Sequence, residues 1–91
     1  MEQTTLTETF QQAVAGSKQL SQRPDNMTLL KLYSLFKQAT DGDAPADSDA
    51  GMFDFVAKAK YNAWDALRGK SKEAAMEEYI KLYNELKGQM G

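Results

Sequence analysis

The side chains with the clearest chemical potential in this sequence are a tyrosine and two lysines placed among apolar residues. Tyr33 and Lys37 are four positions apart, so in a helix a phenol and an ammonium group lie one turn apart on one face. Lys60 falls in the middle of a second apolar stripe, between Val56 and Trp64. A buried unpaired ammonium group is costly, and we see no obvious acidic partner for either lysine one turn away on its own helix. The pattern predicts either lysines that extend to water or a site for an anion.

The segment that positions Tyr33 and Lys37 is residues 29–40, where apolar residues return at helical spacing. At about 100° per residue, these residues form two arcs, about twice the width that packing on one core requires. The first arc contains Leu29, Leu30, Tyr33, Phe36, Lys37 and Thr40, the second contains Leu32, Leu35 and Ala39, and the polar sector contains Lys31, Ser34, Gln38 and Asp41. We expect one arc to face the core and the other to be available for a different contact. A helix covered by protein on both sides is the alternative.

Capping signals and periodicity predict four helices. The first helix begins near Thr5, and the second extends over about Met27 to Asp41. The third extends over about Asp54 to Arg68, and the fourth begins after Ser71, which caps it. Asp25 or Asn26 is suited to cap the second helix, and Gly42 is suited to end it.

The first predicted helix has one narrow apolar face and small residues near its end. This face contains Phe10, Ala13, Val14, Ser17 and Leu20. Gly16 and Ser17 are small enough to let another helix approach closely. Lys18 lies at the edge of the apolar face, where a lysine usually extends to water.

The connection between the second and third helices is rich in Gly, Pro, Asp and Ala, which predicts an exposed loop over residues 42–51. A long connection lets these two helices run parallel instead of forming a tight antiparallel pair. The flanking segments are too short to fold alone, so we expect one all-α domain over residues 1–91. The loop carboxylates lack the spacing of a calcium-binding EF-hand, which argues against a metal site.

Composition narrows the possible functions. The sequence has no cysteine and no histidine, which removes the commonest metal ligand and general base and makes an enzyme an unfavoured prediction. The net charge of −2 argues against nucleic-acid binding. No apolar run approaches the ~18 residues of a membrane span, and the N-terminus lacks the regions of a signal peptide. We therefore expect a cytoplasmic protein without stable membrane insertion, and a monomer by default.

Several ordered blocks of the sequence resemble the acyl-CoA-binding protein family. They are Tyr33–Thr40, Gly42–Asp43, Gly51–Phe55, Lys58–Trp64 and Gly69–Ala75, followed by Tyr79. The resemblance extends over nearly the whole chain. It implies a four-helix bundle with a long crossed connection between helices 2 and 3, and a bowl-shaped site for a fatty acyl thioester of coenzyme A.

The resemblance also implies roles for individual residues. In the family, the residues that match Tyr33 and Lys37 contact the 3′-phosphate and neighbouring groups of CoA. The lysine that matches Lys60 meets the CoA phosphates, the tyrosine that matches Tyr79 contacts the adenine end, and the position of Lys18 faces the ligand.

Two positions and one loop depart from the usual pattern of the family. The loop before Gly51 lacks the usual proline and looks longer than in the family. Phe36 stands where many members have tyrosine, so any hydroxyl contact there is lost, although the ring can still stack on the adenine. Tyr61 stands where tryptophan is frequent, which implies different local packing.

We therefore expect a protein that binds medium- to long-chain fatty acyl-CoA without covalent chemistry, as an intracellular carrier and pool-former in lipid metabolism. Leu29 and Leu30 would meet the acyl chain, and no cofactor or catalysis would be involved. The alternative is a helical protein-interaction module that binds a partner helix with the apolar face of the second helix. That alternative gives no role to Lys60.

Overall fold

The structure is a computed structural model in which residues 3–45 and 55–90 are described, and within these ranges the chain forms four helices and no strand. The helices are α1 (Gln3–Ser17), α2 (Asn26–Asp41), α3 (Phe55–Asp65) and α4 (Lys72–Met90). None of the helices in the described ranges is long and apolar enough to cross a membrane. The predicted all-α fold is therefore confirmed.

The capping signals correctly predicted where α2 and α4 begin. Asp25 Oδ1 accepts a hydrogen bond from the Thr28 backbone N–H at 2.8 Å, and Ser71 Oγ accepts one from the Ala74 N–H at 3.0 Å. Helix α2 ends at Asp41 and is capped by Gly42, as predicted. The positive φ of Gly42, 83°, suits a residue without a Cβ, and its N–H donates to the Gln38 carbonyl.

The ends of α1 and α3 differ from the prediction. Helix α1 already includes Gln3 and stops at Ser17, so Leu20 packs on the core from beyond the helix. Helix α3 stops at Asp65 because the next residues make i→i+3 hydrogen bonds, such as Arg68 N–H to the Asp65 carbonyl at 3.0 Å. The start predicted for this helix at Asp54 lies outside the described residues.

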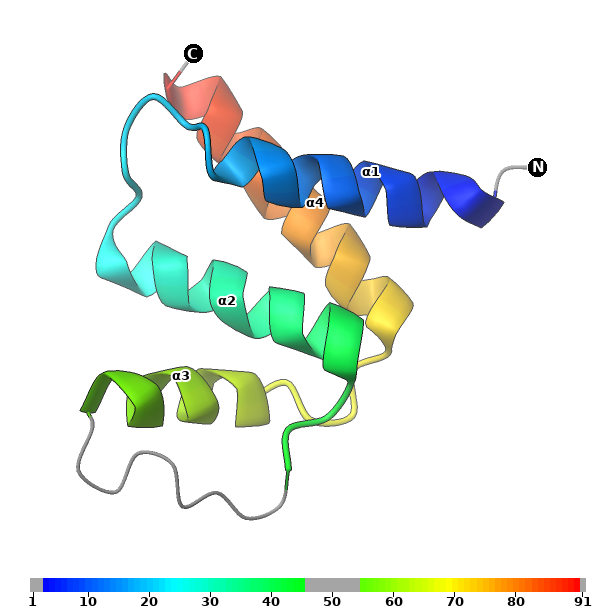
Figure 1. Ribbon diagram of the computed structural model, residues 1–91, viewed down its shortest axis with the longest axis vertical. Helices are drawn as coiled ribbons and strands as arrows, with labels where there is room; N and C mark the ends of the chain where they lie inside the picture. The colour runs from blue at the N-terminus through cyan, green and yellow to red at the C-terminus, as the bar shows by residue number, and fades with distance from the viewer. Residues whose placement is uncertain (1–2, 46–54, 91) are drawn as a thin grey trace.

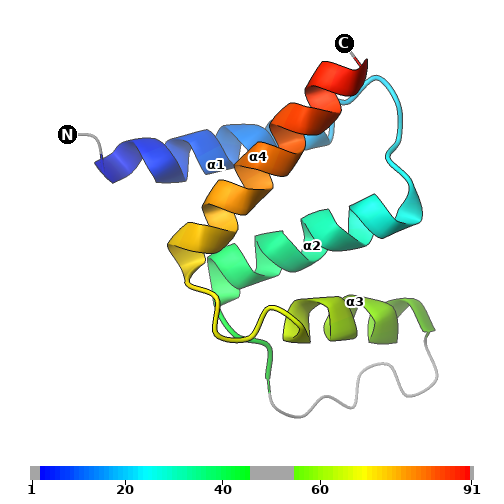
Figure 2. The same cartoon turned by 180° about the vertical axis from the view of Figure 1, so that it is seen from behind.

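The helices follow a spatial order that differs from their order in the chain. Figure 1 shows α2 and α3 side by side and running in the same direction, and α4 crossing diagonally past α1 and α2. The reverse view in Figure 2 shows the same arrangement, with α4 in front. The most extensive contacts are those of α2 with α4, α1 with α4, and α2 with α3. The parallel course of α2 and α3 agrees with the prediction from their long connection.

The core lies where α1, α2 and α4 meet, and its position shows which arc of α2 faces inward. The buried apolar residues of this core are Phe10, Ala13, Leu32, Leu35, Ala39, Ala75, Tyr79 and Leu86. The second arc of α2 therefore meets the core. The Phe10 ring links the three helices: it stacks on Phe36 at 6.2 Å between ring centroids and meets the edge of Tyr79 at 5.3 Å.

The polar sector predicted for α2 is partly wrong, because Ser34 and Gln38 are buried. Ser34 Oγ donates to the Lys31 carbonyl within its own helix at 2.9 Å. Gln38 Nε2 donates to both Asp43 Oδ1 and the Lys70 carbonyl, each at 2.8 Å. These bonds allow a polar sector to be covered by the segments that flank α3.

Helices α1 and α4 approach closely at Gly16, as its small size predicted. A Cβ atom built at this position would lie 2.2 Å from the Tyr83 hydroxyl oxygen and 2.6 Å from Cζ of the same ring. Such distances are far below van der Waals contact. The side chain of Tyr83 therefore occupies space that exists only because residue 16 is glycine.

We predict that Gly16→Ala and Gly88→Ala change stability in opposite directions. Gly88 in α4 has no atom within 4 Å of the added Cβ, so alanine there should stabilise the fold by up to about 1 kcal/mol through helix propensity. At Gly16 the displacement of Tyr83 should outweigh that gain and destabilise the fold by about 1 kcal/mol. Urea unfolding of the two variants measures both effects, and equal stabilisation by both substitutions would contradict the close approach.

Candidate binding site

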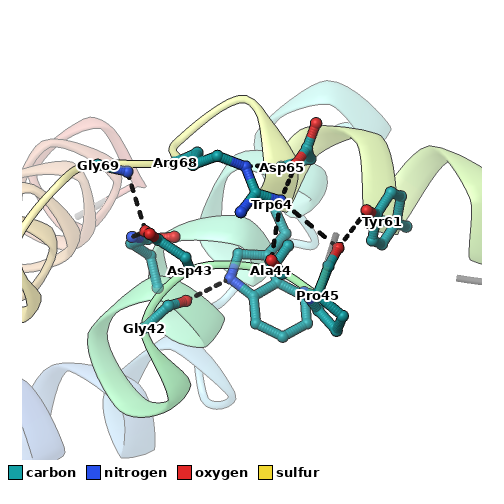
Figure 3. A network of polar contacts seen from close by, with 10 residues as sticks. Gly42, Asp43, Ala44, Pro45, Tyr61, Trp64, Asp65, Arg68 and Gly69 are labelled. Carbon is teal, nitrogen blue, oxygen red and sulfur yellow. Dashed lines mark hydrogen bonds and ion pairs between the residues drawn. The ribbon is translucent and has the colours of Figure 1, made fainter. Parts of the chain in front are cut away.

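The position of α3 beside α2 is fixed by polar contacts where each helix ends. Trp64 Nε1 donates to the Gly42 carbonyl at 2.8 Å, and the Asp43 carboxylate accepts the Gly69 N–H at 2.9 Å (Figure 3). Arg68 donates to the Ala44 carbonyl at 2.8 Å. The segment after α2 is thus attached to the segment after α3, which holds the two parallel helices in register. We call this set of hydrogen bonds, together with those of Gln38 to Asp43 and Lys70, the end clamp.

A cavity of about 600 Å³ lies between the first halves of α2 and α3. Its lining comes from the connection after α1 and from both helices, and consists of Arg23, Asn26, Leu29, Leu30, Tyr33, Phe55, Val56, Ala59 and Lys60. Most of these side chains are apolar, with a few polar groups among them, and the volume is in the range of small-molecule sites. Leu29, Leu30 and Tyr33 of the first arc of α2 therefore line a cavity, whereas Phe36 of the same arc packs on the core.

Two cation–aromatic pairs connect α2 with α3. Lys60 Nζ lies 5.2 Å from the centre of the Tyr33 ring, and Lys37 Nζ lies 4.9 Å from the centre of the Trp64 ring. Tyr33 and Lys37 are four residues apart on α2, and Lys60 and Trp64 are four residues apart on α3. Two parallel helices in register therefore form both pairs at once. An aromatic face attracts an ammonium group without neutralising it, so the positive charge of Lys60 remains available at the edge of the cavity.

Lys37 has an acidic partner on its own helix, which corrects our expectation that it has none. Its Nζ lies 2.6 Å from Asp41 Oδ2, one turn further along α2. This hydrogen bond raises the pKa of the Lys37 ammonium and lowers the pKa of the Asp41 carboxyl. The sequence shows that Asp41 follows Lys37 by four residues, but a helical wheel alone does not show that the two side chains turn toward each other.

Lys60 is exposed and lies at the edge of the cavity, which agrees with the two alternatives predicted for it. None of the described residues of α3 is buried, and Lys60 itself is exposed. The stripe around it lies open at the edge of the cavity, and Val56 on the same stripe is 64% exposed. No burial cost therefore has to be relieved at Lys60, and its charge is already hydrated.

The structure brings together only some of the residues expected at the site. Leu29, Leu30, Tyr33 and Lys60 line the cavity, and Lys37 follows Tyr33 by one turn without lining it. Lys18 is exposed in the turn after α1, and Phe36 packs on the core through Phe10.

Tyr79 is a core residue in this structure. Its side chain is 3% exposed, and its hydroxyl lies 2.8 Å from Ser17 Oγ. Burial raises the pKa of the Tyr79 phenol, and the hydrogen bond with Ser17 opposes part of that rise. The phenol therefore stays protonated at neutral pH and is satisfied within the protein.

Sequence reasoning missed some lining residues, chiefly Arg23, Asn26 and Phe55. Phe55 is 89% exposed, and large exposed apolar surface often marks a binding site. An apolar residue at the start of the third predicted helix is the signal that could have identified it. Arg23 lies in the connection before α2, and only the relative placement of α2 and α3 brings it to the cavity. Its cationic group adds to the positive charge that Lys60 supplies.

A small helical bundle with a mostly apolar cavity and cations at its edge defines a small-molecule-binding protein. Residues 7–83 match the family described as Acyl CoA binding protein. The acyl-CoA-binding protein of Dictyostelium discoideum is 47% identical over 78 residues, which cover 86% of this chain and 92% of that protein. Acyl-CoA-binding protein homolog 1 of Caenorhabditis elegans is 45% identical over 86 residues, or 94% of this chain and 99% of the relative. This chain belongs to the acyl-CoA-binding protein family.

Solved structures agree with this assignment. Acyl-CoA-Binding Protein 2 of Oryza sativa superimposes with a TM-score of 0.83 at 37% identity, over 92% of each chain. The four-helix fold implied by the resemblance in the sequence is therefore confirmed, and so is the family.

The end clamp predicts a specific dependence of stability on pH. Hydrogen bonds from the Gly69 N–H and Gln38 hold the pKa of the Asp43 carboxyl below its usual value. A lowered folded-state pKa stabilises the fold fully above the unfolded pKa of about 4, and this stabilisation is lost as the pH falls through the folded value. Asp43→Asn should therefore be less stable than the unsubstituted protein at neutral pH, and the difference should shrink in acid.

Urea unfolding between pH 2 and pH 7 measures this difference. Asp43→Ala is the control: neither it nor Asp43→Asn has a titrating group at this position, so the difference between the two variants should not change with pH. A gap between the unsubstituted protein and Asp43→Asn that stayed constant down to pH 2 would contradict the role given to the carboxylate.

Proposed function

We propose that this protein binds medium- to long-chain fatty acyl-CoA esters without covalent chemistry and serves as their intracellular carrier and pool-former. The observation that carries the proposal is the composition of the cavity: apolar residues of α2 and α3 lie beside the Lys60 ammonium and the Tyr33 phenol. An acyl-CoA has the same two parts, an apolar chain and a phosphorylated head group. Membership of the acyl-CoA-binding protein family supports this assignment.

The charge of the ligand suits lysines that are concentrated on one face. A CoA head group carries roughly four negative charges near neutral pH, counting its phosphomonoester as close to two. The protein has a net charge of −2, so overall attraction does not favour binding. Local positive potential from Lys60 and Arg23 can still attract the phosphates, because short-range fields dominate in a concave site.

Each residue of the site has a proposed role. Leu29 and Leu30 contact the acyl chain, Tyr33 and Lys37 meet the 3′-phosphate, and Lys60 meets the other phosphates. Lys18 is a further proposed contact, because an exposed lysine in a turn can reorient toward a ligand.

Phe36 and Tyr79 are the aromatic members of the proposed site. The half-buried Phe36 ring has a face on which the adenine can stack. Tyr79 would contribute only the small exposed part of its ring, because its hydroxyl is already paired with Ser17.

The remaining features of the proposal concern the protein as a whole. We propose a single acyl-CoA-binding domain over residues 1–91 that works as a cytoplasmic monomer, without a cofactor or metal, nucleic-acid binding or stable membrane insertion. Catalysis is not part of the proposed function, because the family is one of binding proteins and the sequence lacks histidine and cysteine.

The interaction-module alternative is not favoured. A partner helix bound in the cavity would contact Leu29 and Leu30 but would leave the Tyr33–Lys60 pair without a function. It would also give a member of an acyl-CoA-binding family no acyl-CoA to bind.

Calorimetric titration with saturated acyl-CoAs of increasing length tests the proposed function. We expect saturable 1:1 binding with an intact thioester, tightening with length by up to about fifteen-fold per two carbons and then levelling off where the chain leaves the protein. Release of free CoA would indicate an enzyme. Absence of any binding heat would favour an interaction module. Free CoA bound as tightly as its long-chain thioesters would contradict a role for the apolar lining.

The substitution Leu29→Asp localises the acyl chain in the same titration. It should weaken long-chain ligands more than short-chain ligands, because a carboxylate replaces apolar lining. Ala15→Asp adds the same charge at an exposed position of α1 that does not line the cavity, and it should leave the chain-length dependence unchanged.

We also predict that Lys60→Ala weakens acyl-CoA binding by about 1.5–3 kcal/mol, the range for a hydrogen bond to a charged group. Stability should change by less than about 1 kcal/mol, because Lys60 is exposed and loses only its contact with the Tyr33 ring. Lys58→Ala is the matched control, since Lys58 is exposed on the same helix and does not line the cavity. Equal losses of affinity in the two variants would reduce the role of Lys60 to its general charge.

A further inference from the structure

The ammonium group proposed to receive the ligand's 3′-phosphate already holds an anion of the protein itself. Lys37 Nζ lies 2.6 Å from Asp41 Oδ2, and the two side chains are 27% and 49% exposed. Both residues are therefore accessible from solvent. A ligand phosphate that approaches Lys37 meets a carboxylate at the same nitrogen.

Apart from its i,i+4 ion pair with Lys37, Asp41 is unfavourably placed in its own helix. It is the last residue of α2, where the exposed carbonyl groups carry partial negative charge and disfavour an anionic side chain. Lys72 supplies a second positive charge nearby, since its Cε would lie 3.6 Å from a Cβ built at Gly42. The hydrogen bond and charge of Lys37, a hydrogen bond with Thr40 and the charge of Lys72 lower the pKa of Asp41, so its carboxyl is ionised at neutral pH.

We propose that Asp41 is a specificity-determining residue that competes with the ligand for Lys37. A ligand anion gains the full Lys37 contact only by displacing the Asp41 carboxylate, and it also meets the repulsion of that carboxylate. This inference rests on the proposed function, because it requires the head group of an acyl-CoA to reach Lys37.

The competition favours one class of anion over another. A carboxylate, such as that of a free fatty acid, replaces one carboxylate with another and gains little at Lys37. A phosphomonoester carries close to two charges and three acceptor oxygens, so it retains a net gain after displacing Asp41. Asp41 thus lowers the affinity of Lys37 for every anion, but only the most highly charged one, the 3′-phosphate of CoA, still binds with a net gain.

The test measures the affinities of two ligands for four proteins. The ligands are palmitoyl-CoA and its analogue without the 3′-phosphate, and the proteins are the unsubstituted chain, Asp41→Asn, Lys37→Ala and the double variant. We expect Asp41→Asn to bind palmitoyl-CoA about two- to five-fold more tightly, the range that corresponds to an exposed ion pair. The analogue should bind Asp41→Asn and the unsubstituted chain equally, and Asp41→Asn should tighten palmitoyl-CoA less when Lys37 is already alanine, because only the repulsion by the carboxylate is then removed.

A matched control separates this effect from overall charge. Glu78→Gln removes one carboxylate from another ion pair, that of Lys70 and Glu78, and Glu78 lies on α4 away from the cavity lining. It changes the net charge by the same amount and should leave the affinity for palmitoyl-CoA unchanged. Equal tightening in Glu78→Gln and Asp41→Asn would overturn the competition.

The other outcomes also decide the proposal. Weaker binding by Asp41→Asn would mean that the carboxylate positions Lys37 for the phosphate, and unchanged binding would mean that it has no part in recognition; either result overturns the competition. Asp41→Ser, tested beside Asp41→Asn with thermal unfolding of both, identifies any effect that comes from loss of structure. If the unsubstituted chain itself fails to bind palmitoyl-CoA, the proposed function fails together with this inference.

Discussion

Helix α2 packs on both sides, and the positions of the other helices follow from this constraint. Leu32 and Leu35 face the core formed with α1 and α4, while Leu29 and Leu30 face α3 across the cavity. On the first side apolar side chains fill the space, as close packing of a core requires. On the second side α3 covers the helix incompletely and leaves about 600 Å³ open. The cavity thus exists because one helix has more apolar surface than its neighbours in the described ranges cover.

The two lysines near this surface are held in physically different ways. Lys60 lies over the Tyr33 ring, which orients the ammonium group but leaves its charge intact. Lys37 lies over the Trp64 ring and is also paired with a carboxylate, so its charge is largely compensated before any ligand arrives. An acidic protein can therefore present positive potential at one point of its surface and suppress it a turn away. Net charge says little about such a site.

Local signals in the sequence predicted the helices well, and non-local contacts explain the errors. The caps at Asp25 and Ser71 depend on residues three positions away, so the sequence alone could specify them. The burial of Gln38 depends on Asp43 and on Lys70, which is 32 residues further along the chain, and a helical wheel contains no such information.

The candidate site shows the same division between local and non-local information. The Tyr33 and Lys60 positions were predicted from their place on apolar faces, and the structure brings them together at the cavity. The family resemblance implied that Lys18, Phe36 and Tyr79 contact the ligand, and these three residues do not line the cavity. Arg23 could be found only from the placement of the connection beside α3.

The lack of buried residues in the described part of α3 has a consequence for the dynamics of the protein. Separation of α3 from α2 uncovers no fully buried residue of the described part of α3, so this local opening costs less free energy than global unfolding. Backbone amides of α3 should then exchange their hydrogens through this opening, faster than the amides of α2 and α4. A molecule bound between α2 and α3 stabilises the closed state by an amount that grows with its concentration relative to Kd. The rate of hydrogen exchange in α3 would thereby report how much of the protein has its cavity occupied.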